Sequence, residues 1–228
     1  METEKTIISE HSNLAAKLLR NLENFVDEVG KRGCTTHFGD VLANGDRLEG
    51  VDLTQESGQF TKDHLIFPIL RSLGHDYRAR PTRYAPRWPE KRGTPDFALE
   101  TVPVEVAKRN DVRLFGEVKA PNRLDEARRD VRKYLAADLD YHAVVLLTDG
   151  IEWELWTRPR GRDSECQGRV ATASLADALE TVLRRNKECE TYVRHEVRED
   201  LDEDTFAGFL SDDVLEIVEE QFGVENER

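Results

Sequence analysis

The 228-residue sequence has few cysteines and no long apolar run. Cys34, Cys166 and Cys189 are odd in number and far apart, so they supply neither a disulfide framework nor a Cys-x-x-Cys metal knuckle. Cys34 and His37 have the local spacing of metal ligands but lack a second pair, which argues against a structural zinc. Since a membrane-length apolar stretch and a signal-peptide pattern are both missing, the sequence predicts a cytoplasmic protein that does not enter a membrane.

Basic residues are also scarce relative to acidic ones: 33 Lys and Arg stand against 46 Asp and Glu, a formal net charge of -13. Taken alone, this charge argues against nucleic-acid binding, because affinity for a polyanion comes largely from Lys and Arg. Arginine greatly outnumbers lysine, and the acidic excess is typical of proteins from salt-loving organisms, where salt screens self-repulsion. We therefore expect a halophilic protein in which any contact with DNA comes from a local basic patch.

One such patch lies between residues 71 and 92, where basic and aromatic residues are interleaved. The side chains that we expect to contact DNA are Arg78, Arg80, Arg83, Arg87 and Arg92, mixed with Tyr77, Tyr84 and Trp88. Such a mixture can hold phosphate oxygens and stack on bases. An irregular surface loop whose aromatic rings cover a sheet edge explains the same segment equally well, so both interpretations stay open.

Hydrophobic periodicity predicts alternating helices and strands, and therefore an α/β chain. We expect helices at residues 5–29, 60–74, 125–137, 175–187 and 212–222, and strands at 96–100, 112–119 and on both sides of a turn within 143–156. Residues 33–52 look like an irregular connection with room for a hairpin around Asn44-Gly45. Residues 158–162 form a basic loop, for which a solvated surface is favoured over a second DNA contact.

The most informative motif is Pro95-Asp96, followed about twenty residues later by Glu117-Val118-Lys119. Asp96 opens one predicted strand, and Glu117 and Lys119 close the next. Side chains two residues apart share one face of a sheet, so Glu117 and Lys119 are expected to project together. Pairing of the two strands can bring Asp96 beside them, which would gather two carboxylates and one amine.

This set of side chains suits phosphodiester hydrolysis. Carboxylate oxygens are the ligands by which proteins hold Mg²⁺, an ion that keeps several of its waters. The metal lowers the pKa of a bound water, and the compact lysine ammonium can orient that water or offset charge on the phosphate. In a chain that is 35% charged, however, a Glu-x-Lys pair is more often an ordinary solvated strand face.

The order of elements around the motif resembles the PD-(D/E)xK nuclease superfamily, and within it the N-terminal nuclease domain of type I restriction enzyme motor subunits. The similarity covers about residues 54 to 157, from the helix that ends at Leu73-Gly74 to the hairpin with Thr148-Asp149-Gly150 at its turn. The resemblance implies a restriction-endonuclease-like α/β fold, with a central mixed β-sheet flanked by helices. It also implies a DNA endonuclease that uses Mg²⁺, or Mn²⁺, held by Asp96, Glu117 and the backbone carbonyl of Val118, with Lys119 as the catalytic lysine.

Two departures from the family pattern affect the remaining site residues. Many relatives carry a glutamate on the first helix, but that position falls near Gly58 and Gln59 here, so Glu56 is the nearest candidate to join the metal or to favour the helix dipole. Relatives often show Gln-x-x-x-Tyr on the helix after the Glu-x-Lys strand. The sequence has Asp130 and Tyr134 at this spacing, which keeps both on one helix face. Tyr134 is expected to support the site, whereas Asp130 cannot donate the hydrogen bonds of an amide.

We divide the chain into residues 1–53, an N-terminal helix and connection; 54–158, the nuclease core; and 159–228, an acidic helical extension. The sequence has no P-loop or helicase motif, so any motor must be another protein. A separate methyltransferase subunit is a further open partner. A homodimer is also open. The predicted task is restriction, defence or repair. The alternatives are a catalytically inactive nuclease-fold subunit that binds DNA or acts as a scaffold, and an α/β protein in which Glu117 and Lys119 form an ordinary surface pair.

Overall fold

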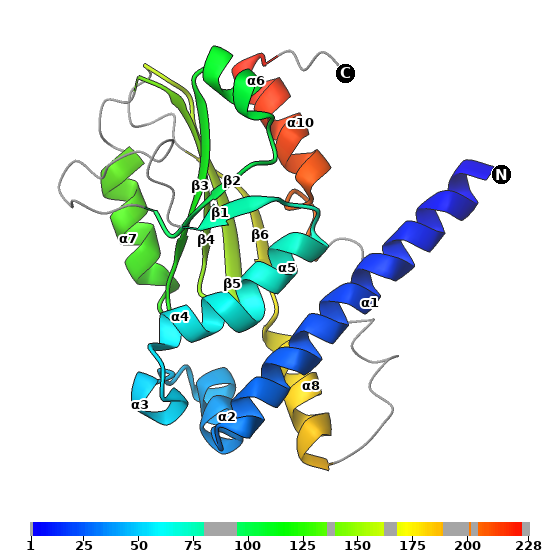
Figure 1. The fold of residues 1–228 in the computed structure, drawn as a ribbon, viewed down its shortest axis with the longest axis vertical. Coiled ribbons are helices and arrows are strands. Elements are labelled where there is room, and N and C mark those ends of the chain that lie inside the picture. The colour runs from blue at the N-terminus through cyan, green and yellow to red at the C-terminus, as the bar shows by residue number, and fades with distance from the viewer. Residues whose placement is uncertain are drawn as a thin grey trace.

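The computed structural model describes residues 2–79, 95–135, 140–161, 168–188, 201 and 205–224 of the chain. It is a mixed α/β structure, in which one six-stranded sheet is flanked by helices on both faces (Figure 1). The predicted fold class is confirmed at this level.

The six strands follow one another across the sheet in the order in which they occur in the chain. They are β1 (Tyr77–Ala79), β2 (Phe97–Leu99), β3 (Val112–Val118), β4 (His142–Thr148), β5 (Glu152–Arg158) and β6 (Gly168–Ser174). All neighbours pair antiparallel except β3 and β4, which are parallel. Parallel neighbours need a long crossover, and helix α7 (Leu124–Leu135) supplies it.

Successive side chains of the central strands point to opposite faces of the sheet and so contribute to two separate hydrophobic layers. On β3, Phe115 belongs to a core with Val131 of α7, whereas Leu114 and Val118 belong to a larger core on the opposite face. Because apolar residues face both ways, β4 and most of β5 are buried along nearly their whole length. The sheet is therefore a rigid platform between two layers of helices.

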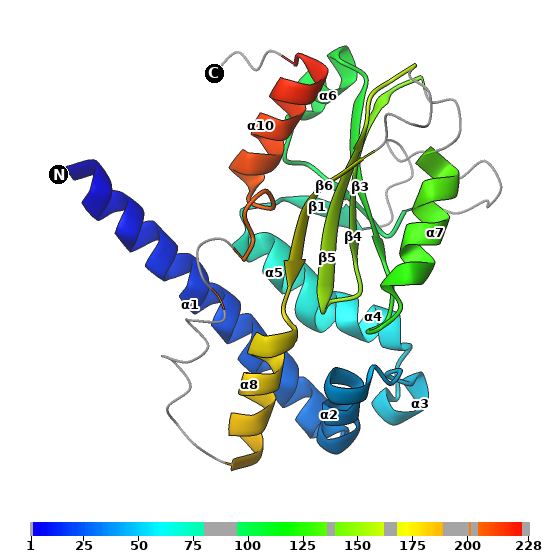
Figure 2. The same ribbon diagram turned by 180° about the vertical axis from the view of Figure 1, so that it is seen from behind.

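Helices from both ends of the chain contribute to the larger core. They include α1 (Glu2–Lys31), the continuous segment α4 (Ser57–Thr61), η1 (Lys62–Ile66) and α5 (Phe67–Ser72), α8 (Ala176–Glu188) and α10 (Ser211–Phe222). Leu22, Phe60, Leu179 and Val218 all belong to this one cluster. The two views in Figures 1 and 2 show α1 crossing beside α5 and α8, whereas α7 lies on the other face of the sheet. The terminal segments therefore share a core with the central one.

Two expectations about connecting segments are wrong. Residues 33–52 hold helix α2 (Thr35–Asn44), not a hairpin, and Gly45 ends this helix with a φ of 73°. Phe38 and Val41 of this helix are completely buried in the larger core, which overrides the poor helix propensity of Gly39 and Asp40. The short helices α3 (Gly50–Leu53) and α6 (Val104–Arg109) were not predicted either.

The second expectation, an exposed loop after Trp156, is wrong at its two ends, whereas residues 160 and 161 form an exposed turn as predicted and residues 162–167 lie outside the described part. Arg158 is the last residue of β5 and is buried, and β6 adds an edge strand before α8. The other predicted helices and strands occur within a few residues of their expected limits. None of the helices in the described part of the chain is long and apolar enough to cross a membrane.

His75 ties the C-terminal segment to the sheet. Its ring is buried, with Nε2 2.7 Å from the carbonyl oxygen of Phe209 and Nδ1 2.8 Å from the hydroxyl of Thr101. Because a carbonyl only accepts, Nε2 must donate, and the neutral ring then accepts from Thr101 through Nδ1. Burial lowers the pKa of His75 below its ordinary value of 6.5.

A histidine with a lowered pKa stabilises the folded state above its unfolded pKa, and this contribution is lost as the pH falls below 6.5. We predict that the free energy of unfolding declines as the pH falls from 6.5 to about 5 in the wild type. His75→Leu removes this slope and costs about 1–3 kcal/mol at pH 7.5, because the Phe209 carbonyl loses its donor. Denaturant unfolding at several pH values measures both effects, with His37→Leu as a control. An unchanged slope in His75→Leu contradicts the assignment.

Candidate metal centre

Strand pairing fixes Asp96 against the strand that carries Glu117. Phe97 pairs with Gly116, and the N–H of Asp96 donates to the Gly116 carbonyl at 3.1 Å. The N–H of Val118 in turn donates to Oδ2 of Asp96 at 2.9 Å. These two hydrogen bonds lie on either side of Glu117 along β3, so the predicted meeting of the two strands is present.

Gly116 permits this close approach because it has no side chain. A Cβ at this position would lie 1.9 Å from Cζ of Phe97, far inside van der Waals contact. The Phe97 ring covers the glycine and packs edge-on against Phe67 of α5, with 6.0 Å between ring centroids. The residue after Asp96 is thereby anchored in the larger core.

Glu117 and Lys119 project together, as the alternation of β3 predicts. Nζ of Lys119 lies 2.7 Å from Oε1 of Glu117, and 3.6 Å from Oδ2 of Asp130 on α7. The backbone N–H of Lys119 donates to the Thr148 carbonyl on β4 at 3.0 Å. Both side chains are mostly buried, with exposed fractions of 13% for Glu117 and 21% for Lys119.

The charges at this point oppose one another. Burial raises the pKa of Glu117; Lys119 works to lower it, and the negative charges of Asp96 and Asp130 raise it further. Burial lowers the pKa of Lys119, but Glu117, Asp130 and Asp96 outweigh that effect and raise it above its ordinary value. Glu117 is therefore less readily ionised than a free glutamate, as expected where acidic groups are crowded out of water.

A fifth charged group reaches the site from the opposite helix layer. Lys62 is only 5% exposed, and its Nζ lies 3.0 Å from Oδ1 of Asp96. It is the first residue of the π-helical turn η1, whose defining hydrogen bond runs from the N–H of Phe67 to the Lys62 carbonyl. Asp96 thus receives Lys62 on one oxygen and the Val118 N–H on the other.

The donor set fits a hard divalent cation. Asp96 and Glu117 supply carboxylate oxygens, which are the ligands that Mg²⁺ prefers. The carbonyl of Val118 lies on the Asp96 edge of β3, because the N–H of the same residue already faces Asp96. Within the described residues, no three His, Cys, Asp or Glu side chains stand together as ready ligands. Lys62 contacts Asp96, and Lys119 contacts Glu117.

The two predicted supporting residues have different outcomes. Glu56 caps helix α4: its two oxygens accept the N–H groups of Gly58 and Gln59 at 3.0 and 2.6 Å. Of the two roles left open for Glu56, the structure shows the one at the helix terminus. Tyr134 lies in α7 on the same helix as Asp130, but its side chain lies outside the described part of the structure.

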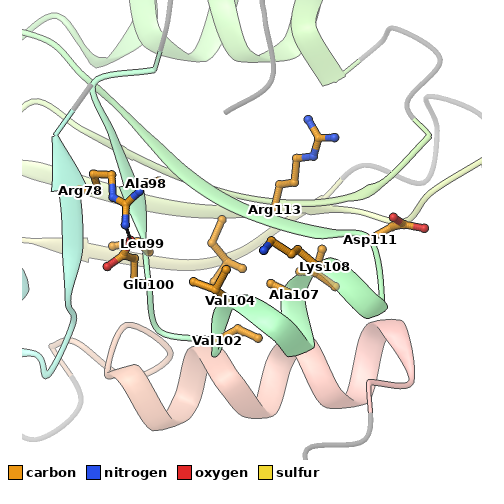
Figure 3. A pocket seen from close by; sticks show the side chains of 12 residues that line it. Arg78, Ala98, Leu99, Glu100, Val102, Val104, Ala107, Lys108, Asp111 and Arg113 are labelled. Carbon is orange, nitrogen blue, oxygen red and sulfur yellow. Dashed lines mark ion pairs between the residues drawn. The ribbon is translucent and has the colours of Figure 1, made fainter. Parts of the chain in front are cut away.

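Most of the side chains predicted to contact DNA lie outside the described residues, namely Arg80, Arg83, Arg87 and Arg92. Arg78 lies in β1 and forms an ion pair with Glu100 at 2.7 Å. Both line a hollow of about 180 Å³ between β2, α6 and the start of β3, which Figure 3 shows from close by. Since Glu117 lies at the other end of β3, this hollow is separate from the metal centre.

Sequence reasoning missed two residues of the metal centre: Lys62, which contacts Asp96, and Asp130, which contacts Lys119. Lys62 was assigned no role, although its spacing to Ile66, Ile69 and Leu73 places it on the apolar stripe of its helix. A lysine on such a stripe is buried, and a buried lysine needs a partner. Asp130 was noted only for lacking an amide, whereas its carboxylate faces Lys119.

A second charged surface lies on the flank of α7 that faces β5 and β6. We call it the arginine groove; it is lined by Asp125, Arg128, Arg129, Arg132 and Arg169. At its base, the buried Glu154 accepts Arg128 at 2.9 Å and Arg169 at 2.6 Å. Burial raises the pKa of Glu154, but hydrogen bonds from Arg128, Trp156 and Arg169 lower it overall, so the carboxylate is ionised at neutral pH.

The arginine groove is close to the metal centre and more basic than the chain as a whole. Register places Glu117, Leu147 and Glu154 side by side on adjacent strands, so Glu117 and Glu154 are about 10 Å apart at the spacing of a sheet. Four arginines against Asp125 and Glu154 leave a net charge of +2 here. This local charge is opposite in sign to the total of -13.

Comparison with protein-family models, with curated proteins and with solved structures finds no match to this chain.

Proposed function

We propose that this chain is a Mg²⁺-dependent DNA endonuclease with a restriction-endonuclease-like fold. The observation that carries the proposal is the pairing of β2 with β3, which gathers Asp96, Glu117 and Lys119 at one end of the sheet. The β3-α7-β4 crossover and the β4-β5 hairpin, in the order expected from the resemblance, support the same interpretation.

The proposed roles follow from the chemistry of each group. Asp96, Glu117 and the Val118 carbonyl would hold the ion, which supplies a water of lowered pKa and polarises the phosphate when bound. Lys119 orients the attacking water or offsets charge on the phosphate, and Asp130 helps keep it protonated. Tyr134 stays a proposed supporting residue, and Glu56 supports the fold as a helix cap.

DNA is the proposed substrate because the arginine groove offers a phosphate-binding surface near the metal centre. Arg129 and Arg132 are exposed, and Arg128 and Arg169 are held in place by Glu154. Planar guanidinium groups fixed in this way suit phosphate oxygens. The loop with Arg80, Arg83, Arg87 and Arg92 remains a further proposed contact.

A specific observation favours a second candidate function, an inactive DNA-binding or scaffolding subunit. Both oxygens of Asp96 have protein partners, and Lys119 contacts Glu117 directly. A site in which lysines permanently replace the metal would hold this geometry without cutting DNA. Both candidate functions allow the same proposed partners: a separate motor or methyltransferase subunit, or a second copy of the chain. For both we also propose a task in restriction, defence or repair in the cytoplasm.

Cleavage of supercoiled plasmid and single-stranded DNA, in high salt with Mg²⁺ or Mn²⁺, tests the proposal. We predict that Asp96→Asn abolishes cutting and that Lys119→Met slows it by roughly 10²–10³-fold, the usual effect of removing one group that stabilises charge in the transition state. Glu105→Gln, on the exposed side of α6, is the matched control and should cut at the wild-type rate. DNA binding without cutting by the wild type favours the scaffold instead.

The arginine groove generates its own prediction. Arg129→Glu combined with Arg132→Glu should weaken binding of labelled duplex DNA, measured by fluorescence anisotropy in EDTA over a range of salt concentrations. The slope of log affinity against log salt should become shallower by about one for each phosphate that the variant no longer neutralises. Lys17→Glu with Arg20→Glu makes the same change of charge on exposed positions of α1. Equal weakening in both double variants would show that only net charge matters.

A further inference from the structure

The position of Lys62 raises the question of how many cations the metal centre can hold. Three carboxylates meet two ammonium groups here: Asp96, Glu117 and Asp130 against Lys62 and Lys119. With the carboxylates ionised, this leaves one net negative charge. One divalent ion reverses it to a single positive charge, whereas a second ion would add two more positive charges in a partly buried site.

The two lysines lie on different sides of the centre. Lys119 extends from β3 toward α7, whereas Lys62 comes from η1 in the opposite helix layer and reaches only Asp96. The aliphatic stem of Lys62 is buried with its head, and the π-helical turn fixes where that stem begins. Lys62 therefore occupies Oδ1 of Asp96, an oxygen that a second cation could otherwise bind.

We propose that Lys62 acts as a built-in cation that holds Asp96 in position and limits the centre to one divalent metal ion. This inference rests on the proposed metal-dependent function. Lys62 donates to Oδ1 of Asp96 and the Val118 N–H donates to Oδ2, so an ion would share Asp96 with Lys62, and Glu117 and the Val118 carbonyl would supply its other protein ligands. Lys62 acts through Asp96 and is a positioning residue.

Mn²⁺ binding to the DNA-free protein tests the inference without relying on activity. Electron paramagnetic resonance of free Mn²⁺ gives the number of ions bound and their affinity. We expect one ion per wild-type chain and one in Lys62→Arg, which keeps the charge. Lys62→Met keeps the stem but removes the repulsion between ammonium and ion, so Mn²⁺ should bind roughly tenfold more tightly.

Lys62→Glu should create a second Mn²⁺ site, because it places another carboxylate beside Asp96. Both Lys62→Met and Lys62→Glu should lower the melting temperature in EDTA, and Mn²⁺ should restore it more than in the wild type. If Lys62→Met fails to fold, Lys62→Gln provides the same neutral test. Lys17→Gln on α1, an exposed position, is the matched control and should behave as the wild type.

The outcomes separate this inference from the proposed function. Two results would overturn the role of Lys62 and leave a metal-dependent nuclease intact. The first is two Mn²⁺ ions bound per wild-type chain. The second is an unchanged Mn²⁺ affinity in Lys62→Met together with a single bound ion in Lys62→Glu. If neither the wild type nor any Lys62 variant binds Mn²⁺, and the wild type does not cut DNA, both the role of Lys62 and the proposed function are overturned. Tighter binding in Lys62→Met with loss of the bound ion in Asp96→Asn supports both.

Discussion

The pairing of β2 with β3 is the constraint on which the site depends. Gly116 permits the close approach of the two strands, because the Phe97 ring covers the position that a side chain would occupy. Beyond the paired residues, the Val118 N–H donates a hydrogen bond to Asp96. Because Phe97 is anchored in the larger core, the carboxylate before it cannot move away from β3 without unpacking that core. The position of Asp96 relative to Glu117 is therefore set by packing and strand register, not by a bound ion.

Opposing charges give the centre its second property. Burying Glu117 beside Asp96 and Asp130 raises its pKa, and Lys119, which follows β3, offsets part of that cost. Lys62, from η1 in the helix layer on the other face, pairs with Asp96. The three carboxylates and two lysines together have an excess of negative charge. About 10 Å away the local charge has the opposite sign. There the buried Glu154 holds Arg128 and Arg169 through ion pairs, and the arginines outnumber the acidic residues.

The sequence predicted the central strands, α7 and the meeting of Asp96 with Glu117 and Lys119, because alternation and chain order determine strand pairing. It did not reveal β6, whose mostly exposed residues carry no apolar alternation, or α2, whose helix is stabilised by the burial of Phe38 and Val41. Lys62 was missed because its contact with Asp96 joins residues 34 positions apart and depends on a π-helical turn that no local pattern predicted. Burial on an apolar stripe was the available signal.

The claim that Asp96 and Glu117 hold a divalent ion is tested most directly by a structure from crystals grown with Mn²⁺, because anomalous scattering locates the ion without reference to activity. The account predicts one peak between Asp96 and Glu117, within coordination distance of the Val118 carbonyl, with Lys62 still bonded to Asp96. A map with no peak at saturating Mn²⁺, or with a peak elsewhere and both carboxylates bonded only to their lysines, would contradict it.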